Sequence, residues 1–250
     1  MVLLVDVGNS NIVFAFTRNG QIDKTYRFKS LSDKTSDDYY ILLKDMLEYY
    51  EFDDVMISSV VPIITSALRK LFLNYFNIDA MILGPGIKTG IQLKVDDPKS
   101  VGADMISDSA GAMIYAKEAI IIDLGTATKY IYCKNNTFLG CSIAPGIAIS
   151  MKALVNNAAL LPNVEMVAPK NVISTNTISC IQSGVIFGAA SQVDGMVNRI
   201  KRELNCPNAL VIATGGLSEV IVPFCENKIM LEKNLTLHGL LDIYNKNKNR

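Results

Sequence analysis

The sequence predicts an α/β protein of two duplicated halves, in which mixed sheets open on β-hairpins and helices cover the sheet faces. The first observation behind this prediction is an internal repeat. Residues 3–11 and 120–128 share the order apolar strand, Asp, apolar residue, Gly and then small residues. The second observation is that strand-like and helix-like apolar patterns alternate along the chain, which is typical of a largely parallel sheet. The repeats begin about half a chain apart, so we expect one half at residues 1–117 and the other at 118–250.

Local signals place the elements within each half. Each repeat continues into a second apolar stretch and a turn, Asn19-Gly20 in the first copy and Asn135-Asn136 in the second, and such turns favour hairpins. Ser36 can cap a helix, and Pro62 suits the first turn of another. In the first half we expect helices at 36–50, 62–76 and 103–116 and strands at 55–61 and 80–83. In the second half we expect helices at 146–157, 177–204, 217–225 and 237–244, a strand at 208–213 and a frayed polar tail at 245–250.

The composition excludes several function classes. The chain of 250 residues has 24 Lys and Arg against 24 Asp and Glu, and this neutral balance argues against a general nucleic-acid binder. The single histidine, His238, excludes a zinc site built on several histidines, and a Ser-His-Asp triad could use only that residue. Its position in an apolar stretch favours an ordinary structural role at the start of a helix.

Cysteine usage and segment types predict a cytoplasmic protein. The five cysteines are widely spaced and form no C-x-x-C pair, as expected in a reducing compartment. The first residues carry no basic region, so we expect no signal peptide. No run reaches 18 apolar residues, so we expect no membrane span and no membrane partner.

The repeated turn has the chemistry of a phosphate site. Asp6 ends a strand and can hold Mg²⁺ directly or through water, while Gly8 lets a ligand approach the backbone and the small polar residues after it offer donors to phosphate oxygens. One Asp-x-Gly turn is weak evidence, because any hairpin can contain one. Two at matched positions favour a pair of phosphate loops, with two ordinary hairpins as the alternative. A third feature, Gly215-Gly216 after a strand, leaves room for a flat purine or a ribose.

Two other phosphate motifs are excluded, and one further acid is a candidate. The segment Gly84–Thr89 lacks the Gly that a P-loop needs directly before Lys-Thr, and no G-x-G-x-x-G follows the first strand. Asp104 falls in the first turn of an expected helix, where an acid ordinarily stabilises the helix end. The functional alternative is a carboxylate that accepts a proton from a substrate hydroxyl.

A series of short motifs stands in order along most of the chain. They are Asp-Val-Gly-Asn-Ser-Asn at 6–11, Ser-Ser-Val-Val-Pro at 58–62, Val-Gly-Ala-Asp at 101–104, Asp-Leu-Gly-Thr-Ala-Thr at 123–128, Ile-Ala-Pro-Gly at 143–146, Ala-Ala-Leu-Leu-Pro at 158–162, Asn-Thr with Gln-Ser-Gly within 176–184, and Ala-Thr-Gly-Gly-Leu at 213–217. Together they resemble the type III pantothenate kinase family, from residue 1 to about residue 243. The resemblance implies two actin-like (ribonuclease H-like) halves, as in the actin, sugar kinase and Hsp70 superfamily. It also implies a homodimer that uses ATP with Mg²⁺ to convert pantothenate to 4′-phosphopantothenate, the first step of coenzyme A synthesis.

The same resemblance implies roles for particular residues. The ATP phosphate loop corresponds to Asp6, Val7, Gly8, Asn9, Ser10, Asn11, Ile12 and Val13, and a second ATP contact corresponds to Thr126. The substrate contacts correspond to Val95, Gly102, Ala103, Asp104, Met105 and Thr177, with Asp104 as the catalytic base. Asp123 corresponds to a ligand of the monovalent cation, K⁺ or NH₄⁺, that the family requires.

The chain departs from the family pattern mainly on the substrate side. Met105 stands where the family has an arginine, a natural partner of an anionic substrate, and Val95 stands where a tyrosine is usual. Lys129 replaces a threonine and could supply the missing positive charge. Two other functions stay open: a catalytically weak nucleotide-binding relative that acts through a protein partner, and a non-enzymatic actin-like assembly protein.

Overall fold

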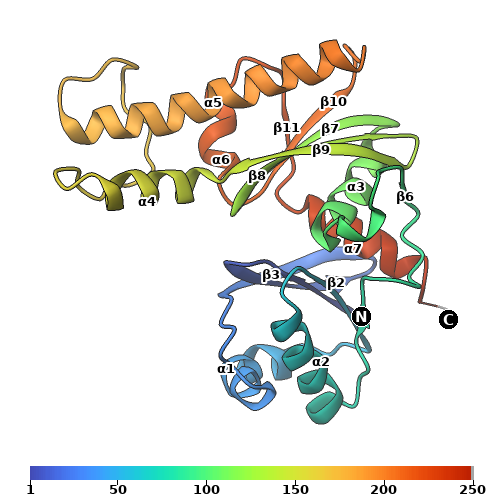
Figure 1. The fold of residues 1–250 in the computed structure, drawn as a ribbon. Coiled ribbons are helices and arrows are strands. Elements are labelled where there is room, and N and C mark those ends of the chain that lie inside the picture. Colours follow the sequence, from blue (N-terminus) through green and yellow to red (C-terminus); the bar gives the residue numbers. More distant parts are fainter. Residues whose placement is uncertain (249–250) are drawn as a thin grey trace. The chain divides into compact units, whose positions relative to one another are not determined.

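The computed structural model describes residues 1–248, which form two compact units (Figure 1). The first unit comprises Met1–Gln92, Asp96–Ile114 and the described residues from Leu235 onward, and the second comprises Leu93–Val95 and Tyr115–Asn234. The predicted halves, 1–117 and 118–250, differ from these units mainly at the end of the chain. The segment that begins at Leu235 packs with the first unit instead of the second.

The two sheets have matching topology, which confirms the predicted duplication. The first sheet has the order β3-β2-β1-β4-β5 and the second has the order β11-β10-β7-β8-β9-β6. In the first sheet β1, β2 and β3 pair antiparallel, and β4 and β5 join in parallel. In the second sheet β7, β8 and β9 pair antiparallel and β10 and β11 join in parallel, while the short β6 is added next to β9. The strands of the first sheet are β1 (Val2–Val7), β2 (Asn11–Arg18), β3 (Gln21–Lys29), β4 (Asp54–Ser59) and β5 (Met81–Ile82). Those of the second are β6 (Gln92–Leu93), β7 (Glu118–Leu124), β8 (Ala127–Lys134), β9 (Thr137–Pro145), β10 (Leu210–Thr214) and β11 (Met230–Leu231).

The turns predicted from sequence are present, and each joins the second strand of its repeat to a third. Asn19 and Gly20 have φ of 51° and 75°, and Asn135 and Asn136 have φ of 48° and 57°. Two successive residues with positive φ match the twist of a tight hairpin, and Asn and Gly adopt that conformation at low cost. Both copies also carry a register shift in the same place, between Phe16 and Thr17 and between Tyr132 and Cys133.

The helices follow the predicted pattern with small changes at their ends. They are α1 (Ser36–Tyr49), α2 (Pro62–Phe76), α3 (Ala103–Tyr115), α4 (Ile147–Asn157), α5 (Thr177–Glu203), α6 (Ser218–Ile221) and α7 (Leu235–Asn245). The cap of α1 is Thr35 rather than Ser36, because Thr35 and Asp38 form a reciprocal capping box. The helix expected at 217–225 is shorter, since α6 gives way to a 3₁₀ turn at Val222–Phe224.

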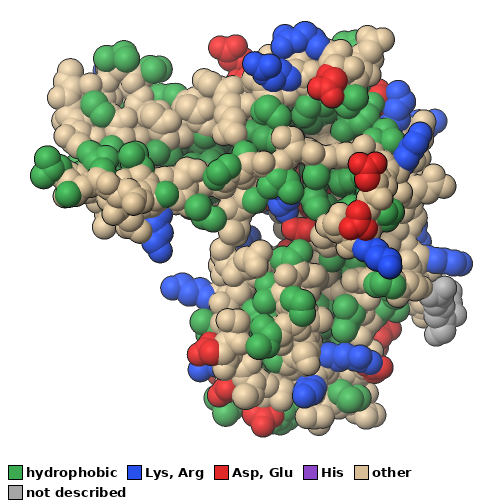
Figure 2. Space-filling model, in the orientation of Figure 1, with side chains coloured by type: hydrophobic (Ala, Val, Ile, Leu, Met, Phe, Trp, Pro, Cys, Tyr) green, Lys and Arg blue, Asp and Glu red, His purple; other side chains and the backbone are tan. Residues whose placement is uncertain are grey.

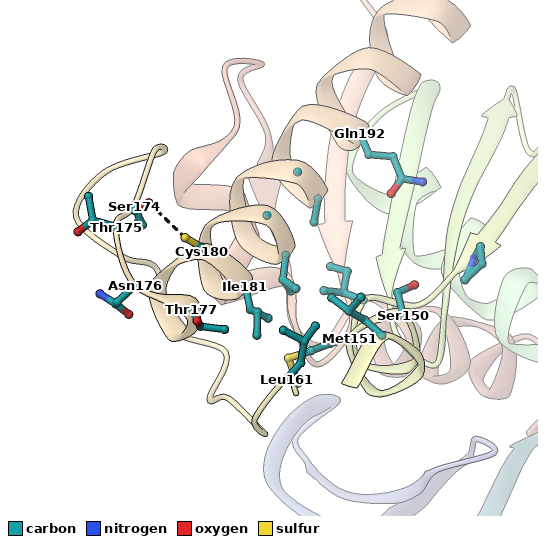
Figure 3. Close-up of a pocket in the computed structure, with 17 residues that line it drawn as sticks. Ser150, Met151, Leu161, Ser174, Thr175, Asn176, Thr177, Cys180, Ile181 and Gln192 are labelled. Carbon is teal, nitrogen blue, oxygen red and sulfur yellow. Dashed lines mark hydrogen bonds between the residues drawn. The ribbon is translucent and has the colours of Figure 1, made fainter. Parts of the chain in front are cut away.

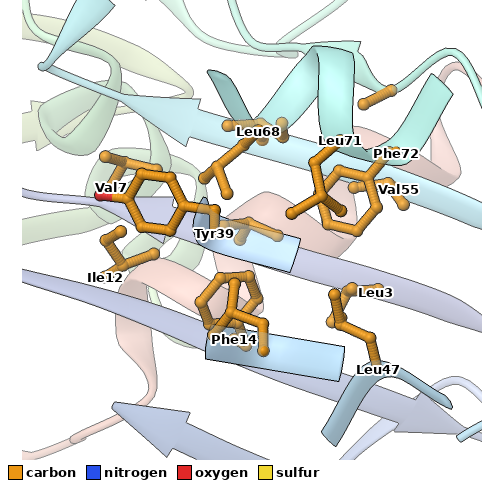
Figure 4. Close-up of a cluster of buried hydrophobic side chains, with 14 of the residues drawn as sticks. Leu3, Val7, Ile12, Phe14, Tyr39, Leu47, Val55, Leu68, Leu71 and Phe72 are labelled. Carbon is orange, nitrogen blue, oxygen red and sulfur yellow. The ribbon is translucent and has the colours of Figure 1, made fainter. Parts of the chain in front are cut away.

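The first unit buries apolar side chains on both faces of its sheet. On one face, Leu3 and Phe14 of the strands meet Tyr39 of α1 and Leu68 and Phe72 of α2 (Figure 4). Tyr39 can be fully buried because its hydroxyl donates a 2.8 Å hydrogen bond to the Leu31 carbonyl oxygen. On the other face, α7 supplies apolar residues that pack on the sheet: Leu237, Leu240, Leu241 and Ile243.

The contacts of α7 explain why the end of the chain belongs to the first unit. A Cβ on Gly239 would overlap the carbonyl oxygen of Ser107, so α7 and α3 cross at backbone contact. Beyond the helix, the buried Asn247 side chain bonds both the N–H and the carbonyl oxygen of Lys88, at 3.0 and 2.9 Å. The expectation of a frayed tail is therefore wrong at Asn247, and its last part, 249–250, lies outside the described residues.

Candidate active site

The first predicted phosphate loop is a tight turn at the carboxyl end of β1. The Gly8 N–H donates a 2.9 Å hydrogen bond to the Asn11 carbonyl oxygen, and the Ser30 hydroxyl donates to the Gly8 carbonyl oxygen at 2.6 Å. These bonds fix the backbone while the side chains of Asn9 and Ser10 stay exposed. Asp6 is half-buried at the start of the turn. The arrangement leaves polar side chains and a carboxylate at one edge of the sheet.

The remaining residues of this loop lie in the sheet. Val7 and Ile12 are opposite each other in β1 and β2 and are buried, whereas Val13 lies opposite Asp6 and is half-buried. Any contact of Val7 or Ile12 with a ligand must therefore use the main chain. Their side chains hold the loop in place through packing.

The segment around Asp104 reaches the same edge of the first sheet. The Val60 N–H, just after β4, donates a 3.1 Å hydrogen bond to the Val7 carbonyl oxygen. A Cβ on Gly102 would lie 3.5 Å from Cγ1 of Val60, so the segment before α3 contacts the residue that binds the phosphate loop. The same Cβ would lie only 2.5 Å from Oδ1 of Asp104, so a larger residue at position 102 would displace this carboxylate.

Asp104 and Met105 differ in exposure although they are adjacent. Asp104 is half-buried in the first turn of α3, and its Oδ1 accepts a 2.8 Å hydrogen bond from the Met105 N–H. Ala103 is also half-buried, but the Met105 side chain is only 8% exposed. An apolar residue so deeply buried contributes to the core of the first unit, and this gives position 105 a packing role beside the predicted substrate role.

Two predicted substrate residues belong to the second unit. Val95 is half-buried and follows Lys94, whose N–H donates to the Phe138 carbonyl oxygen at 3.0 Å. Thr177 is exposed at the first position of α5, directly after Asn176, whose side chain caps the helix.

The second predicted phosphate loop also closes as a tight turn. The Gly125 N–H donates a 3.2 Å hydrogen bond to the Ala127 carbonyl oxygen, and Thr126 is exposed at the tip. Gly146, at the start of α4, packs against this turn so closely that a Cβ would overlap the Thr126 carbonyl oxygen. Gly215, at φ of 91°, lies so close to Asp123 that a Cβ there would be 2.5 Å from Oδ1 of that carboxylate.

Asp123 forms a salt bridge that sequence reasoning missed. Lys129 lies directly opposite Asp123 on β8, and its Nζ is 2.6 Å from Asp123 Oδ2. The two side chains are 12% and 15% exposed. The Lys129 ammonium thus lies at the carboxylate to which the family resemblance assigned K⁺ or NH₄⁺. The sequence analysis singled out Lys129, but only as a positive charge for an anionic substrate and not as a partner of Asp123.

A groove of about 790 Å³ runs between α4 and α5 in the second unit (Figure 3). Its lining is mainly apolar, with residues such as Met151, Leu161 and Ile181, and its polar groups gather near the start of α5. Thr177 is among these lining residues. Figure 3 also shows Cys180, whose thiol donates to the Ser174 carbonyl oxygen at 3.2 Å.

The described residues limit which ions this chain can bind by itself. Within residues 1–248, no group of three or more His, Cys, Asp or Glu side chains is arranged to hold a metal ion. A single carboxylate such as Asp6 fits Mg²⁺ that arrives with a nucleotide, because Mg²⁺ keeps water and phosphate oxygens as its other ligands. No described helix combines the length and apolar character needed to span a bilayer.

Comparison with known proteins decides the family. The family model described as type III pantothenate kinase matches residues 2–199. The type III pantothenate kinase of Acholeplasma laidlawii is 42% identical over 247 residues, and 99% of each chain is covered. The chain belongs to the type III pantothenate kinase family. A second such kinase, from Citrifermentans bemidjiense, is 42% identical over 255 residues and covers 99% of this chain and 100% of its own.

This type III pantothenate kinase family member also resembles solved structures in its fold. The (R)-2-hydroxyglutaryl-CoA dehydratase component A from Acidaminococcus fermentans has a TM-score of 0.55 at 16% identity, covering 97% of this chain and 96% of its own. At that identity the likeness concerns the fold alone. With the matched strand orders, it agrees with the duplicated actin-like architecture. As a member of the type III pantothenate kinase family, the protein is a phosphotransferase.

Proposed function

We propose that this protein transfers the γ-phosphoryl group of ATP to pantothenate and forms 4′-phosphopantothenate, the first step of coenzyme A synthesis. The observation that carries the proposal is the full-length match to type III pantothenate kinases at 42% identity. The geometry of the first unit supports it, because Val60 connects the Asp6 turn with the Asp104 segment at one sheet edge.

In this proposal the two turns bind ATP. Asp6 holds the Mg²⁺ that accompanies the nucleotide, and Mg²⁺ neutralises phosphate charge there. The exposed side chains of Asn9 and Ser10 and the backbone of Gly8 donate to phosphate oxygens, and the exposed Thr126 supplies a further hydroxyl. Asn11 and the main chain of Val7, Ile12 and Val13 complete the first turn.

Asp104 acts on the acceptor alcohol. The hydroxyl oxygen of pantothenate forms a bond to the γ-phosphorus while the bond from that phosphorus to the bridging oxygen of ADP breaks. The hydroxyl proton passes to the Asp104 carboxylate, whose position is held by Gly102 and by the Met105 N–H. Phosphoryl transfer depends mainly on such positioning and on charge neutralisation.

We assign the other substrate contacts to Ala103, Met105, Val95 and Thr177. The support differs between them, since Thr177 is exposed on a groove whereas Met105 is buried. A hydroxyl at the start of a long helix can bind a carboxylate, because the helix N-terminus attracts negative charge. Pantothenate carries such a carboxylate.

The experiment that tests the function is a coupled ADP-release assay with purified protein, with and without pantothenate. We expect ADP release that requires pantothenate and a product heavier by one phosphoryl group in mass spectrometry. Binding of ATP without turnover would instead favour the relative that acts through a protein partner. ATP-dependent light scattering without turnover would favour an assembly protein.

We also propose that the protein works as a homodimer through an apolar patch on α4, the loop after it and the start of α5. Figure 2 shows hydrophobic side chains gathered over this region. The patch consists of the exposed residues Ile149, Leu154, Leu160, Val167, Val172, Ile173 and Ile178. Exposed apolar residues in such number within one region are typical of an interaction site.

Sedimentation velocity tests this patch. Ile173, which is 84% exposed, is changed to Asp, and Ile41 of α1, which is 68% exposed but in the first unit, is changed to Asp as the control. We expect a dimer for the wild type and for Ile41→Asp and a monomer for Ile173→Asp. A monomeric wild type contradicts the proposal.

We also propose a cytoplasmic location for this protein. The five free cysteines support it, because unpaired cysteines suit a reducing compartment.

A further inference from the structure

Lys129 and Asp123 form a nearly buried ion pair on neighbouring strands of the second unit. They are direct cross-strand partners, with Lys129 Nζ 2.6 Å from Asp123 Oδ2 and side chains only 12% and 15% exposed. Because so little solvent reaches the pair, screening of the attraction between the two charges is weak.

The other side of the carboxylate is closed by backbone. A Cβ on Gly215 would lie 2.5 Å from Asp123 Oδ1, and one on Gly125 would lie 3.2 Å from the same atom. Thr214 is the parallel partner of Asp123 on β10 and is buried. The carboxylate is therefore held between glycine backbone on one side and the Lys129 ammonium on the other.

The first copy of the repeat has no lysine at the cross-strand position opposite its acid. Asp6, the equivalent of Asp123, has Val13 as its cross-strand partner. The two duplicated acids thus share a backbone setting but differ in the residue that stands opposite them on the neighbouring strand, which is Val13 in the first copy and Lys129 in the second. This difference between the two copies indicates that Asp123 has a function that Asp6 does not share.

We propose that the Lys129 ammonium is a built-in replacement for a monovalent cation at Asp123, so that this protein needs neither K⁺ nor NH₄⁺ there. A lysine ammonium carries the same charge as either ion and, like free NH₄⁺, presents N–H donors to a carboxylate. The residues around Asp123 do not fit an added cation, since it would have to share Oδ2 with an ammonium of like charge. The inference goes beyond the phosphorylation proposed above and does not depend on which alcohol is phosphorylated.

Thermal unfolding in different chlorides tests the inference without any need for turnover. The melting temperature of the wild type and of Lys129→Met is measured in KCl, NH₄Cl, NaCl and tetramethylammonium chloride at equal ionic strength. We expect the same value in all four salts for the wild type. Lys129→Met should melt about 5–10 °C lower in NaCl, because one partner of a buried pair is lost. KCl or NH₄Cl should restore about half of that loss.

Two variants serve as controls. The first is Lys134→Met, which removes another cross-strand ammonium on β8, 2.8 Å from Glu118 but 50% exposed. It should show no preference among the salts, because the Glu118 carboxylate is 25% exposed to water and also accepts a 2.6 Å hydrogen bond from the Tyr132 hydroxyl. The second is the double change Asp123→Asn with Lys129→Met, which removes the carboxylate as well and should lose the response to KCl.

Turnover gives a second readout, and this arm rests on the proposed function. The ratio of kcat/KM in KCl to that in NaCl should stay within about twofold for the wild type and exceed about tenfold for Lys129→Met. A wild type whose melting temperature or rate rises specifically with K⁺ overturns the proposal, even if Lys129→Met fails to fold. So does a folded Lys129→Met that responds equally to all four salts.

Discussion

The backbone N–H of Val60 donates a 3.1 Å hydrogen bond to the carbonyl oxygen of Val7. Through this bond the strand end that contacts Gly102 is fixed to the turn that begins at Asp6. The two carboxylates proposed to act in phosphoryl transfer, Asp6 and Asp104, therefore stand on segments that are linked through Val60. Substituting one of these acids should impair the role proposed for that acid and leave the position of the other acid unchanged.

Asp6→Asn should lower kcat by at least about a hundredfold, because it removes a preorganised charge while keeping the size of the side chain. The ADP-release assay measures this loss. Asp23→Asn, an acid exposed on β3 of the same unit, is the matched control and should keep the wild-type rate. A near-normal rate for Asp6→Asn would remove Asp6 from the mechanism.

Asp104→Asn should nearly abolish turnover and leave ATP affinity within about threefold, because the carboxylate is proposed to act on the alcohol and not on the nucleotide. Isothermal titration with a non-hydrolysable ATP analogue and the rate assay separate the two effects. Asp96→Asn, an exposed acid shortly before α3, should change neither. Loss of nucleotide affinity in Asp104→Asn would contradict this assignment.

Met105→Arg restores the family residue, and the sequence alone led us to expect tighter pantothenate binding. The structure changes the expected result, because the Met105 side chain is 8% exposed and an arginine there has to be buried. We expect a clear fall in melting temperature and no gain in pantothenate affinity. Met105→Leu should cost less than about 1.5 kcal/mol. Ten-fold tighter binding in a stable Met105→Arg protein would show that the position faces the substrate.

Gly146→Ala should displace the second phosphate turn, since its Cβ would overlap the Thr126 carbonyl oxygen and lie 2.7 Å from that of Gly125. We expect the KM for ATP to rise at least about fivefold and the melting temperature to fall, as in other overpacked sites. Gly195→Ala is the control. It lies within α5 with nothing within 4 Å of the added methyl group, so it should be neutral or stabilising. An unchanged KM in Gly146→Ala would mean that the turn does not bind ATP.

Cys141 reports on the charge of Lys129. Partial burial raises the pKa of the Cys141 thiol, and the Lys129 ammonium acts in the opposite direction. In Lys129→Met this second effect is lost, the thiol pKa rises further and less thiolate is present at pH 8. Iodoacetamide should then modify Cys141 roughly two- to threefold more slowly. Peptide mapping distinguishes it from Cys180, also exposed, whose rate should stay constant; an unchanged Cys141 rate would contradict the expected effect.

The elements that sequence predicted well are those set by local chemistry. Pro62 begins α2, and the Asn-containing turns fall where positive φ is needed. The strands β3 and β9 after those turns were less visible, because each has one largely exposed face and a mixed composition. The place of α7 in the first unit could not be predicted, since it depends on packing with segments far away in sequence.

In the candidate site, too, the features set by neighbouring residues could be predicted from sequence and those set by distant contacts could not. Its turns were predictable because Asp, Gly and small residues stand together in the chain. The Lys129–Asp123 pair was not, because the second turn is one residue shorter than the first. Aligning the motifs therefore sets Lys129 against Ile12, whereas the strand register sets it against the position of Val13. Burial of Met105 was likewise hidden, since sequence shows a family position but not the side of α3 that packs inward.

The location of α7 has a consequence for how the polypeptide is made. Val2 and Leu4 pack in one apolar cluster with Leu237 and Leu240, which are synthesised more than 230 residues later. During synthesis one face of the first sheet stays uncovered until α7 has been made, whereas all residues of the second unit precede α7 and can pack earlier. The native structure of the first unit is completed only when α7 packs on its sheet, and a variant without α7 should be prone to aggregation.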